Sequence, residues 1–248
     1  MTAAPPTIDL NADLGEGFPH DAELLRVVTS ANVASGAYTR ARDAIQRALA
    51  GAAEHGVAVG AHLSYPDVEG FGRRRLGLGV DELLASLRRQ LSNLRAWAAR
   101  VPGQPAIRYV KPHGALYHAV LEDGPEREAL AALLDAECLP VLLAPQVAAG
   151  VFGVPVFAEG FADRRYLPGG RLAPRTEVGA VLEDDREVAA QAVRLASGLT
   201  PKRVPARAWP GPVSSVCVHG DSPSSAVLAR AVAEGLRENG FRLRAFAA

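Results

Sequence analysis

Short apolar runs alternate along the chain with longer segments in which apolar residues recur every three or four positions. Short runs rich in β-branched residues are typical of buried strands, whereas the longer period is typical of amphipathic helices. The chain therefore repeats a unit of one strand followed by one helix. We expect seven strands, within residues 7–15, 27–35, 56–65, 106–114, 139–145, 154–163 and 214–221.

Helices are predicted between these runs by their apolar stripes and by residues suited to their ends. A leucine stripe at positions 84, 87, 91 and 94 marks a helix over 81–100, with Asp81 as its expected N-cap. The last helix, within 222–240, is expected to have Ser222 as its cap and Pro223 in its first position. Further helices are expected over 125–137, over 186–198 and around the apolar face formed by residues 45, 48, 49 and 52.

The alternation predicts a parallel sheet covered by helices, because parallel strands need crossover connections. Seven strands suit either a closed β/α barrel or an open, doubly wound sheet. No change of composition divides the chain, so we expect one domain over 1–248. The sequence contains neither Gly-x-Gly-x-x-Gly nor Gly-x-x-x-x-Gly-Lys-Ser/Thr, so the two common phosphate cradles are missing from it.

Composition narrows the class of protein without identifying it. Of the 248 residues, 48% are hydrophobic, which is enough for a folded core. The 27 Lys and Arg balance 27 Asp and Glu, so the net charge gives no reason to expect a nucleic acid or an anionic membrane as a partner. The sequence has no leader pattern and no uncharged apolar run of membrane-spanning length, which predicts a soluble cytoplasmic protein. Cys138 and Cys217 lie in apolar runs and are expected to be buried free thiols.

Polar residues gather where the predicted strands end. The reacting groups of a β/α barrel come from the carboxyl ends of several strands, so residues at these ends are expected to share one pocket. Three of the six histidines, His62, His113 and His219, occupy this position in different units, which scattered surface histidines would not do. The other polar residues at these ends are Asn11, Asp13, Glu16, Ser64, Tyr65, Asp67, Lys111, Glu159, Asp163 and Asp221.

Some of these residues also have structural explanations. Asp67 and Asp221 suit helix caps or Asx-turns as well as they suit a site. Asp9 and Asn11 alternate along the first strand, so one or both can close a polar layer inside a barrel. The pair at 74 and 75, two arginines, is expected on a solvated loop. The pattern as a whole, rather than any single residue, favours a functional site.

Lys111 is expected beside two histidines in a partly dry pocket, which predicts a pKa depressed by desolvation and by like charge. Such a lysine can carry a proton, or it can stay charged and stabilise an oxyanion, while Asp13 or Glu16 supplies the opposite role. A set of one Asp and two His can instead bind zinc, with ligands gathered from separate strands. The spacing of the residues does not decide between these chemistries.

Six motifs follow one another along the chain: DLNADLGEGF, SANVASG, AAEHGVAVGAHLSYPDVEGFGRR, VKPHGALYH, FADRRYLPGGRLAPRTEVGAVL and VCVHGDSPSSAVLARAV. Together, from about Ile8 to about Leu236, they resemble the LamB/YcsF family. The resemblance implies a distorted (β/α)7 TIM-like barrel of the glycoside hydrolase/deacetylase type. It also implies ATP-dependent opening of the 5-oxoproline lactam to L-glutamate, with ATP as cosubstrate and with separate B and C subunits as partners.

The polar motif residues of that family fall largely on positions that the strand ends had already indicated. The chemistry of lactam opening, rather than the resemblance itself, divides them into two groups, with a lysine and an arginine as cations, Asp13 or Glu16 as the base and His113 or His62 as the acid. None is assigned to a metal, although a divalent metal stays open. The catalytic residues are expected to be Asp13, Glu16, His62, Lys111 and His113. The substrate-binding residues are expected to be Asn11, Tyr65, Asp67, Arg73, His219 and Asp221.

The segment after the second strand departs from the family, which usually reads Cys-Gly-Phe-His-Ala-Gly-Asp-Pro where this chain reads SGAYTRAR at 35–42. Tyr38 thus replaces a histidine and Ala41 an acidic residue, and Leu63 replaces a usual proline. Two alternative functions stay open. One is a metal-dependent carbohydrate or amide deacetylase on the same barrel, which the supply of Asp and His suggests. The other is a non-catalytic subunit that binds a small molecule, which the altered segment suggests.

Overall fold

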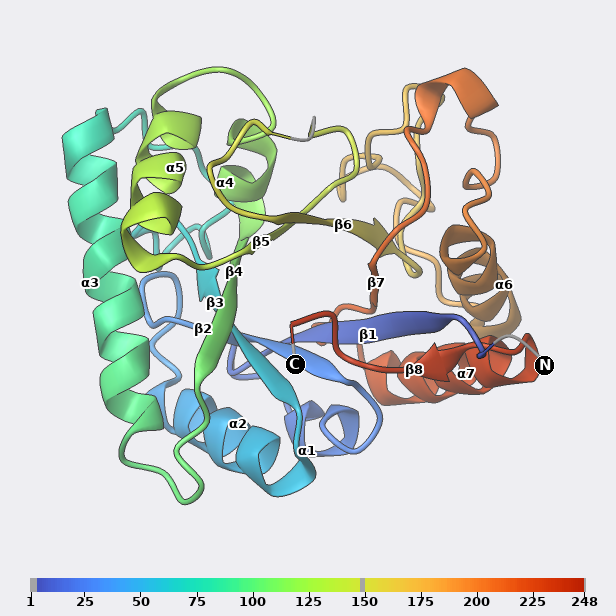
Figure 1. The fold of residues 1–248 in the computed structure, drawn as a ribbon, viewed down its shortest axis with the longest axis horizontal. Helices are drawn as coiled ribbons and strands as arrows, with labels where there is room; N and C mark the ends of the chain where they lie inside the picture. The colour runs from blue at the N-terminus through green and yellow to red at the C-terminus, as the bar shows by residue number, and fades with distance from the viewer. Residues whose placement is uncertain (1–3, 148–149, 248) are drawn as a thin grey trace.

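A computed structural model describes residues 4–147 and 150–247, and its central feature is a closed barrel of seven parallel strands (Figure 1). The first strand pairs with the second, Asn11 opposite Ser30, and with the seventh, Asp9 opposite Ser215. This double pairing closes the sheet, so the β/α barrel is confirmed and the open sheet is wrong. The strands are β1 (Thr7–Leu14), β2 (Ser30–Ala34), β3 (Ala58–Leu63), β4 (Ile107–Pro112), β5 (Val141–Leu143), β6 (Val156–Phe161) and β7 (Ser215–Cys217).

Helices surround the barrel, with α3 beside α5 on one flank and α6 beside α7 on another (Figure 1). The connection from β5 to β6 contains no helix among its described residues, which is the main distortion of the repeated unit. Each long helix buries an apolar stripe against the strands. The helices are α1 (Asp21–Leu24), α2 (Arg42–His55), α3 (Val80–Ala98), α4 (Gly114–Ala119), α5 (Pro125–Glu137), α6 (Asp185–Ala196) and α7 (Ser225–Glu238), with a 3₁₀ turn, η1 (Ala206–Ala208).

Two predicted helix caps are wrong. Helix α3 begins at Val80 after Gly79, and Asp81 lies in its first turn, where a carboxylate favours the helix dipole without capping a backbone N–H. Helix α7 begins at Ser225 after Ser224. The predicted cap, Ser222, instead accepts a hydrogen bond at 3.3 Å from the backbone nitrogen of Ser224, so it forms a turn ahead of the helix.

An eighth strand, β8 (Arg242–Leu243), was not predicted, because two residues are too few to carry a pattern. It pairs in parallel with the first residues of β1. The chain that follows places the ring of Phe246 against Tyr109, at 4.7 Å between centroids, and against Phe157, at 4.6 Å. These contacts close the end of the barrel at which the strands begin.

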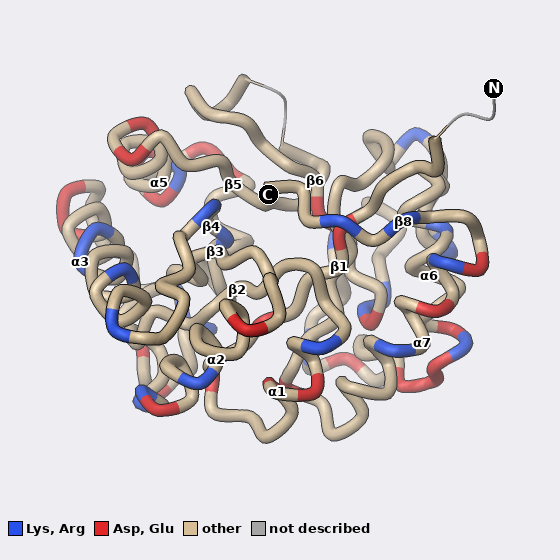
Figure 2. The backbone as a smooth tube through the Cα atoms, turned by 60° about the horizontal axis from the view of Figure 1, so that its bottom comes forward, with Lys and Arg blue, Asp and Glu red and all other residues tan. Residues whose placement is uncertain are grey.

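Alternation along β1 separates the core from the barrel interior. Leu10 and Ala12 belong to the apolar core, whereas Asp9, Asn11 and Asp13 make their hydrogen bonds with polar side chains of the neighbouring strands. Acidic and basic residues are interspersed over the outer elements (Figure 2). None of the described helices has both the length and the apolar character needed to span a membrane.

The two cysteines behave differently. Both thiols are free, as predicted, and Cys217 is buried in β7. Cys138, however, is exposed, so its predicted burial in a strand is wrong. It follows α5 in the left-handed conformation, with φ of 50°, and the strand begins three residues later at Val141.

Candidate active site

A cavity of about 720 Å³ opens at the carboxyl ends of the strands. This is the end at which sequence reasoning placed a shared pocket, and residues from β1, β3, β4 and β7 or the loops after them meet there. The predicted site residues on its wall are Asp13, Glu16, His62, Arg73, Lys111, His113, His219 and Asp221.

Lys111 stands at the base of this cavity between two buried carboxylates. Its Nζ donates to Oδ1 of Asp13 at 2.9 Å and lies 2.8 Å from Oε1 of Glu159, an ion pair of poor hydrogen-bond geometry. Burial lowers the pKa of Lys111, but Asp13, followed by Cys217 and Glu159, outweighs burial and raises this pKa well above its ordinary value. The predicted depression of this pKa is therefore wrong, because the two carboxylates are closer to the ammonium group than the histidines. Lys111 is a permanent cation.

A chain of hydrogen bonds inside the barrel, on the side away from the cavity, fixes the position of Asp13. The Nδ2 of Asn32 donates to Asp13 at 2.8 Å and to Asn11 at 2.7 Å, and Tyr109 donates to Asn32 at 2.7 Å. Asn11 in turn donates to Ser215 at 2.7 Å. Asn11 thus lies beneath the cavity, where it supports Asp13.

Glu16, His62 and His113 form a second cluster at the cavity wall. The Nε2 of His62 lies 3.0 Å from Nδ1 of His113, and Oε1 of Glu16 lies 3.8 Å and 3.3 Å from these two atoms. The Oδ2 of Asp13 lies 3.5 Å from the same Nε2 of His62. Four atoms with lone pairs therefore converge on one small volume.

Backbone carbonyls fix the tautomers of both histidines. Nδ1 of His62 lies 3.0 Å from the oxygen of Lys111, and Nε2 of His113 lies 2.9 Å from the oxygen of Phe71, so each of these nitrogens must carry a hydrogen. The two nitrogens that face each other then carry lone pairs, which repel unless a cation or a proton lies between them. Burial lowers the pKa of His113, which disfavours the proton.

This donor set fits a divalent metal. Ligand bonds of about 2.0–2.2 Å at tetrahedral or octahedral angles place ligand atoms about 3.0–3.5 Å apart, close to the spacings in this cluster. Glu16, His62 and His113 supply one ligand atom each, all within 4.8 Å of one another. The carbonyl partners of the histidines are the kind of outer contact that orients metal ligands. Glu16 thus takes the place that sequence reasoning had given to Asp13, which is engaged by Lys111.

Tyr38 packs against this cluster. Its hydroxyl donates to Oε1 of Glu16 at 2.9 Å, and its ring stacks on His113 with centroids 3.9 Å apart. Burial, followed by the charge of Glu16, raises the pKa of Tyr38 well above its ordinary value, so the phenol stays a hydrogen-bond donor. Where the family usually has a histidine, this chain therefore has a group that orients Glu16.

The turn after β4 brings the second histidine into place. Gly114 has a φ of +57°, a conformation that favours glycine, and a Cβ there would lie 2.5 Å from the oxygen of Gly72. The backbone nitrogen of Ala115 donates to that same oxygen at 2.9 Å. This close approach of two loops sets His113 against the oxygen of Phe71.

His219 and Asp163 form a dyad on the opposite wall. The carboxylate of Asp163 accepts from the backbone nitrogen of His219 and lies 2.9 Å from its Nδ1, which leaves Nε2 without a partner among the described residues. Burial raises the pKa of Asp163, but the charge and hydrogen bonds of His219 outweigh it, so this pKa is lowered. The position of Asp163 at a strand end is visible in the sequence, whereas its pairing with His219 needs the fold.

Asp221 is neither a helix cap nor an Asx-turn. Its Oδ2 accepts from Arg73 at 3.0 Å and from Arg175 at 2.7 Å, so one carboxylate holds two arginines at the cavity rim. Sequence reasoning identified Arg73 and Asp221 but missed Arg175, because Arg175 lies in a long loop whose course the sequence does not indicate.

Besides Asn11, two more of the predicted binding residues do not line the cavity. Tyr65 donates to Glu126 at 2.7 Å, and Asp67 pairs with Arg74 and accepts from the backbone nitrogen of Gly70 at 2.9 Å. Arg75, expected to be free in solvent, pairs with Glu126 at 2.8 Å. These contacts anchor the loop after β3, and the loop in turn carries Arg73 to the cavity and the oxygen of Phe71 to His113.

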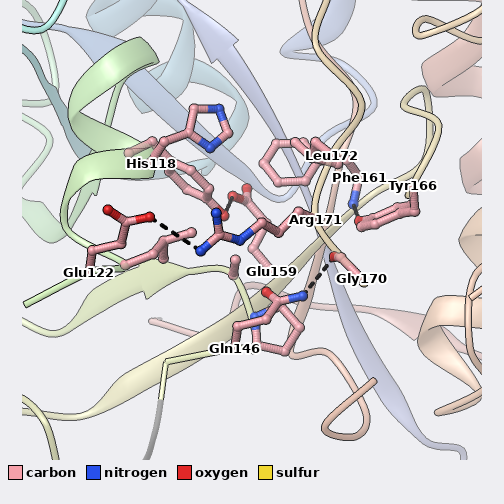
Figure 3. A pocket seen from close by; sticks show the side chains of 13 residues that line it. His118, Glu122, Gln146, Glu159, Phe161, Tyr166, Gly170, Arg171 and Leu172 are labelled. Carbon is pink, nitrogen blue, oxygen red and sulfur yellow. Dashed lines mark hydrogen bonds and ion pairs between the residues drawn. The ribbon is translucent and has the colours of Figure 1, made fainter. Parts of the chain in front are cut away.

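A smaller apolar recess of about 70 Å³ adjoins the main cavity and shares Phe161 and Leu172 with it (Figure 3). Arg171 bridges its edge to Glu122 at 3.2 Å, and Gln146 donates to the oxygen of Gly170 at 2.7 Å. Buried Glu159 forms part of its floor. The strand-end pattern had indicated Glu159, but not that it shares Lys111 with Asp13.

Comparisons with known proteins agree with this geometry. A model of the LamB/YcsF family matches residues 8–248. A protein of Paracidovorax citrulli, named as the A subunit of 5-oxoprolinase, is 41% identical over 251 residues, which cover 97% of this chain and 99% of that protein. The crystal structure of a lactam utilization protein from Thermus thermophilus superposes with a TM-score of 0.83 and 34% identity, covering 97% of this chain and all of the other.

A more distant likeness concerns the fold alone. A family 4 carbohydrate esterase from Streptomyces lividans superposes with a TM-score of 0.55 and 12% identity, covering 97% of this chain and 93% of that one. The predicted deacetylase-type barrel is therefore confirmed as an architecture.

Proposed function

The chain belongs to the LamB/YcsF family, and from that premise we propose that it is the A subunit of a 5-oxoprolinase, a hydrolase that opens the lactam ring of 5-oxo-L-proline to L-glutamate. The near full-length likeness to a protein of that name is the observation that carries the proposal. We further propose that the reaction consumes ATP and needs separate B and C subunits. The cavity fits such chemistry, because a permanent cation, a carboxylate and histidines all line it.

A five-membered lactam resists hydrolysis because its carbonyl is resonance-stabilised and its nitrogen is a poor leaving group. Transfer of a phosphoryl group from ATP to the lactam oxygen, with loss of the ring N–H proton, gives an imidate whose carbon water can attack. Water adds to that carbon, the C–N bond breaks as the nitrogen takes up protons, and a second water hydrolyses the resulting γ-glutamyl phosphate, so L-glutamate, ADP and inorganic phosphate are released. The protein must supply a cation for the developing negative charge, a base for water and an acid for the nitrogen.

Lys111 supplies the cation in this proposal. Its raised pKa keeps it protonated throughout the reaction, so it stabilises an oxyanion and does not carry a proton. Arg73, at the rim, is the second cation and faces the same cavity.

The proton-transfer roles fall to Glu16 and His219. Glu16 has no cation within ion-pair distance among the described residues other than the two histidines, so its carboxylate is free to act as the base for water. His219 has an unpartnered Nε2 toward the cavity, among the residues that the structure describes, and the carboxylate of Asp163 beside its Nδ1 stabilises the imidazolium that a general acid requires. His62 and His113, the earlier candidates for the acid, have both ring nitrogens engaged.

The ATP site is proposed to be built with the partner subunits, because the sequence of this chain lacks both common phosphate cradles. An ATP-coupled reaction places the assembly in the cytoplasm. The direct test is L-glutamate formation from 5-oxo-L-proline by the three purified subunits. We expect glutamate only when all three subunits and ATP are present, and glutamate formed by the two partners alone would contradict the proposal.

A second candidate is a metal-dependent amide or carbohydrate deacetylase, which the convergence of lone pairs from Glu16, His62 and His113 favours. These three residues would hold the metal, and a divalent metal in such a site polarises a carbonyl or activates water. Metal analysis of the purified protein tests this candidate. A stoichiometric divalent ion that is lost in Glu16→Gln, together with deacetylase activity in the absence of ATP, would favour it over the lactam reaction.

A further inference from the structure

Arg164 lies on the cavity wall, is only 5% exposed, and has no carboxylate of residues 4–147 or 150–247 within ion-pair distance. Its Nε donates to the oxygen of Ala180 at 3.2 Å, and its Nη2 donates to the oxygen of Ala173 at 2.6 Å. These carbonyls satisfy donors but neutralise no charge. A buried charge without a counter-charge is unfavourable, so this guanidinium is prepared for an anion that the cavity admits.

The charges around Arg164 strengthen this conclusion. Burial, and then the positive charge of Arg175, lower the pKa of Arg164 to about 10, so the side chain is still charged at neutral pH. The nearby carboxylates are already engaged: Asp221 holds Arg73 and Arg175, and Asp163 holds His219. This wall of the cavity therefore has a surplus of positive charge.

We propose that Arg164 binds the α-carboxylate of the lactam substrate. The inference rests on the proposed function, in which the substrate carries one carboxylate at a fixed distance from the lactam carbonyl. The Nη1 of Arg164 has no partner among the described residues, and a planar guanidinium matches a carboxylate in geometry and charge. Arg164 also follows Asp163 directly in the chain, so one segment after β6 anchors both substrate recognition and the His219 dyad.

A pair of ligands tests the carboxylate contact without any mutation. The probes are 5-oxo-L-proline and 2-pyrrolidinone, the same ring without the carboxylate, titrated calorimetrically into the full-length chain. We expect 5-oxo-L-proline to bind about tenfold or more tightly than 2-pyrrolidinone. Equal affinities would overturn the proposal. Phosphate that binds through Arg164 in place of 5-oxo-L-proline would also overturn it, because the anion would then be a phosphoryl group.

Variants assign the contact to one side chain. Arg164→Gln is expected to abolish the tenfold advantage and to leave 2-pyrrolidinone binding unchanged, while Arg164→Lys, which keeps the charge, retains part of the advantage. Arg165→Gln is the matched control, because Arg165 pairs with Glu177 away from the cavity. Thermal melts monitored by circular dichroism identify any variant that fails to fold. A folded Arg164→Gln protein that keeps the full advantage would overturn the proposal.

Turnover by the three-subunit mixture separates this inference from the function on which it rests. Arg164→Gln is expected to raise KM for 5-oxo-L-proline about tenfold with little change in kcat. Wild-type turnover with an unchanged KM in this variant would overturn the inference and leave the function intact. No wild-type turnover, together with carboxylate binding that still depends on Arg164, would overturn the function and support the anion site.

Discussion

The two ends of the barrel interior contain the same kind of residue, but the pKa values of the two carboxyl groups are shifted in opposite directions. At the closed end, Asp9 accepts hydrogen bonds from the hydroxyls of Thr29, Ser30 and Ser215, and no cation lies within ion-pair distance among the described residues. At the open end, four residues along the same strand, Asp13 pairs with Lys111. Burial raises the pKa of Asp9 to about 6, whereas Lys111 holds the pKa of Asp13 well below its ordinary value.

The difference teaches that burial alone does not determine the charge of a carboxylate in this barrel. Neutral hydroxyls leave Asp9 half protonated near pH 6, and a buried ammonium group keeps Asp13 ionised. The layer in which buried carboxylates pair with an ammonium group is thus confined to the end that opens into the cavity. The closed end is a structural polar layer.

The largest effect is expected from removing the cation at the open end. Lys111→Met leaves Asp13 and Glu159 buried without the ammonium group that they share, which should lower the free energy of unfolding by about 3–5 kcal/mol at neutral pH. The loss should shrink as the pH falls, because the two carboxylates can then take up protons. Urea unfolding at several pH values measures this effect. Lys202→Met, at an exposed ion pair of 3.3 Å with Glu187, is the control and should change stability by less than about 0.5 kcal/mol.

The closed end should respond in the opposite direction. Between about pH 4 and 6 the folded protein holds the Asp9 proton that the unfolded chain releases, so stability falls as the pH rises through this window. Asp9→Asn should therefore raise the free energy of unfolding at pH 7.5, by at most about 3 kcal/mol, and should flatten its pH dependence. Part of the slope should remain, because burial also raises the pKa of Asp21 to about 6. An unchanged slope would mean that Asp9 is charged like Asp13.

A smaller effect tests whether Phe246 covers the end of the barrel that contains Asp9. Phe246→Ala removes the ring that packs on Tyr109 and Phe157, and it should cost about 1–2 kcal/mol, because the side chain is only partly buried. Admission of water to Asp9 should also lower the pKa of its carboxyl toward the ordinary value. Carboxyl titration by nuclear magnetic resonance checks that shift, and a pKa that stays near 6 would argue against Phe246 as the closure.

The smallest effect concerns the residue that replaces a usual histidine. Tyr38→Phe removes one hydrogen bond to Glu16 and should lower the free energy of unfolding by about 1 kcal/mol. Thermal unfolding measures this change. Tyr65→Phe is a useful comparison, because it removes a similar bond to Glu126 outside the cavity. If Tyr38 orients the reaction centre, only Tyr38→Phe should also reduce turnover.

Periodicity predicted the strands and the edge at which their polar ends gather, whereas the closed barrel, rather than an open sheet, was expected from the family resemblance. Alternating runs place the strands, and strand ends place Asp13, His62, Lys111 and His219 on one cavity. Periodicity does not indicate which side chains pair with one another across the barrel interior. The sharing of Lys111 between Asp13 and Glu159, which reversed its predicted pKa, depends on β1, β4 and β6 meeting inside the closed sheet.

The conformations of the loops were the second feature that the sequence did not predict. Tyr65 and Asp67 stand beside a strand end just as site residues do, yet Tyr65 turns toward Glu126 of α5 and Asp67 toward Arg74 of its own loop. Arg164 lies in a segment rich in Arg, Gly and Pro that suggested only a surface loop, and it is buried because carbonyls of the same segment hold its guanidinium.

The most direct test of a reaction centre at the open end compares the two ends in one assay. ATP-dependent glutamate formation by the complete three-subunit mixture is measured with the wild-type chain, Lys111→Met and Asp9→Asn, each verified as folded at the assay temperature. We predict that Lys111→Met loses about a hundredfold or more in kcat, as the removal of a charge-stabilising donor does, while Asp9→Asn stays close to wild type. Wild-type rates in Lys111→Met, or an equal loss in Asp9→Asn, would contradict the placement of the reaction centre at the open end.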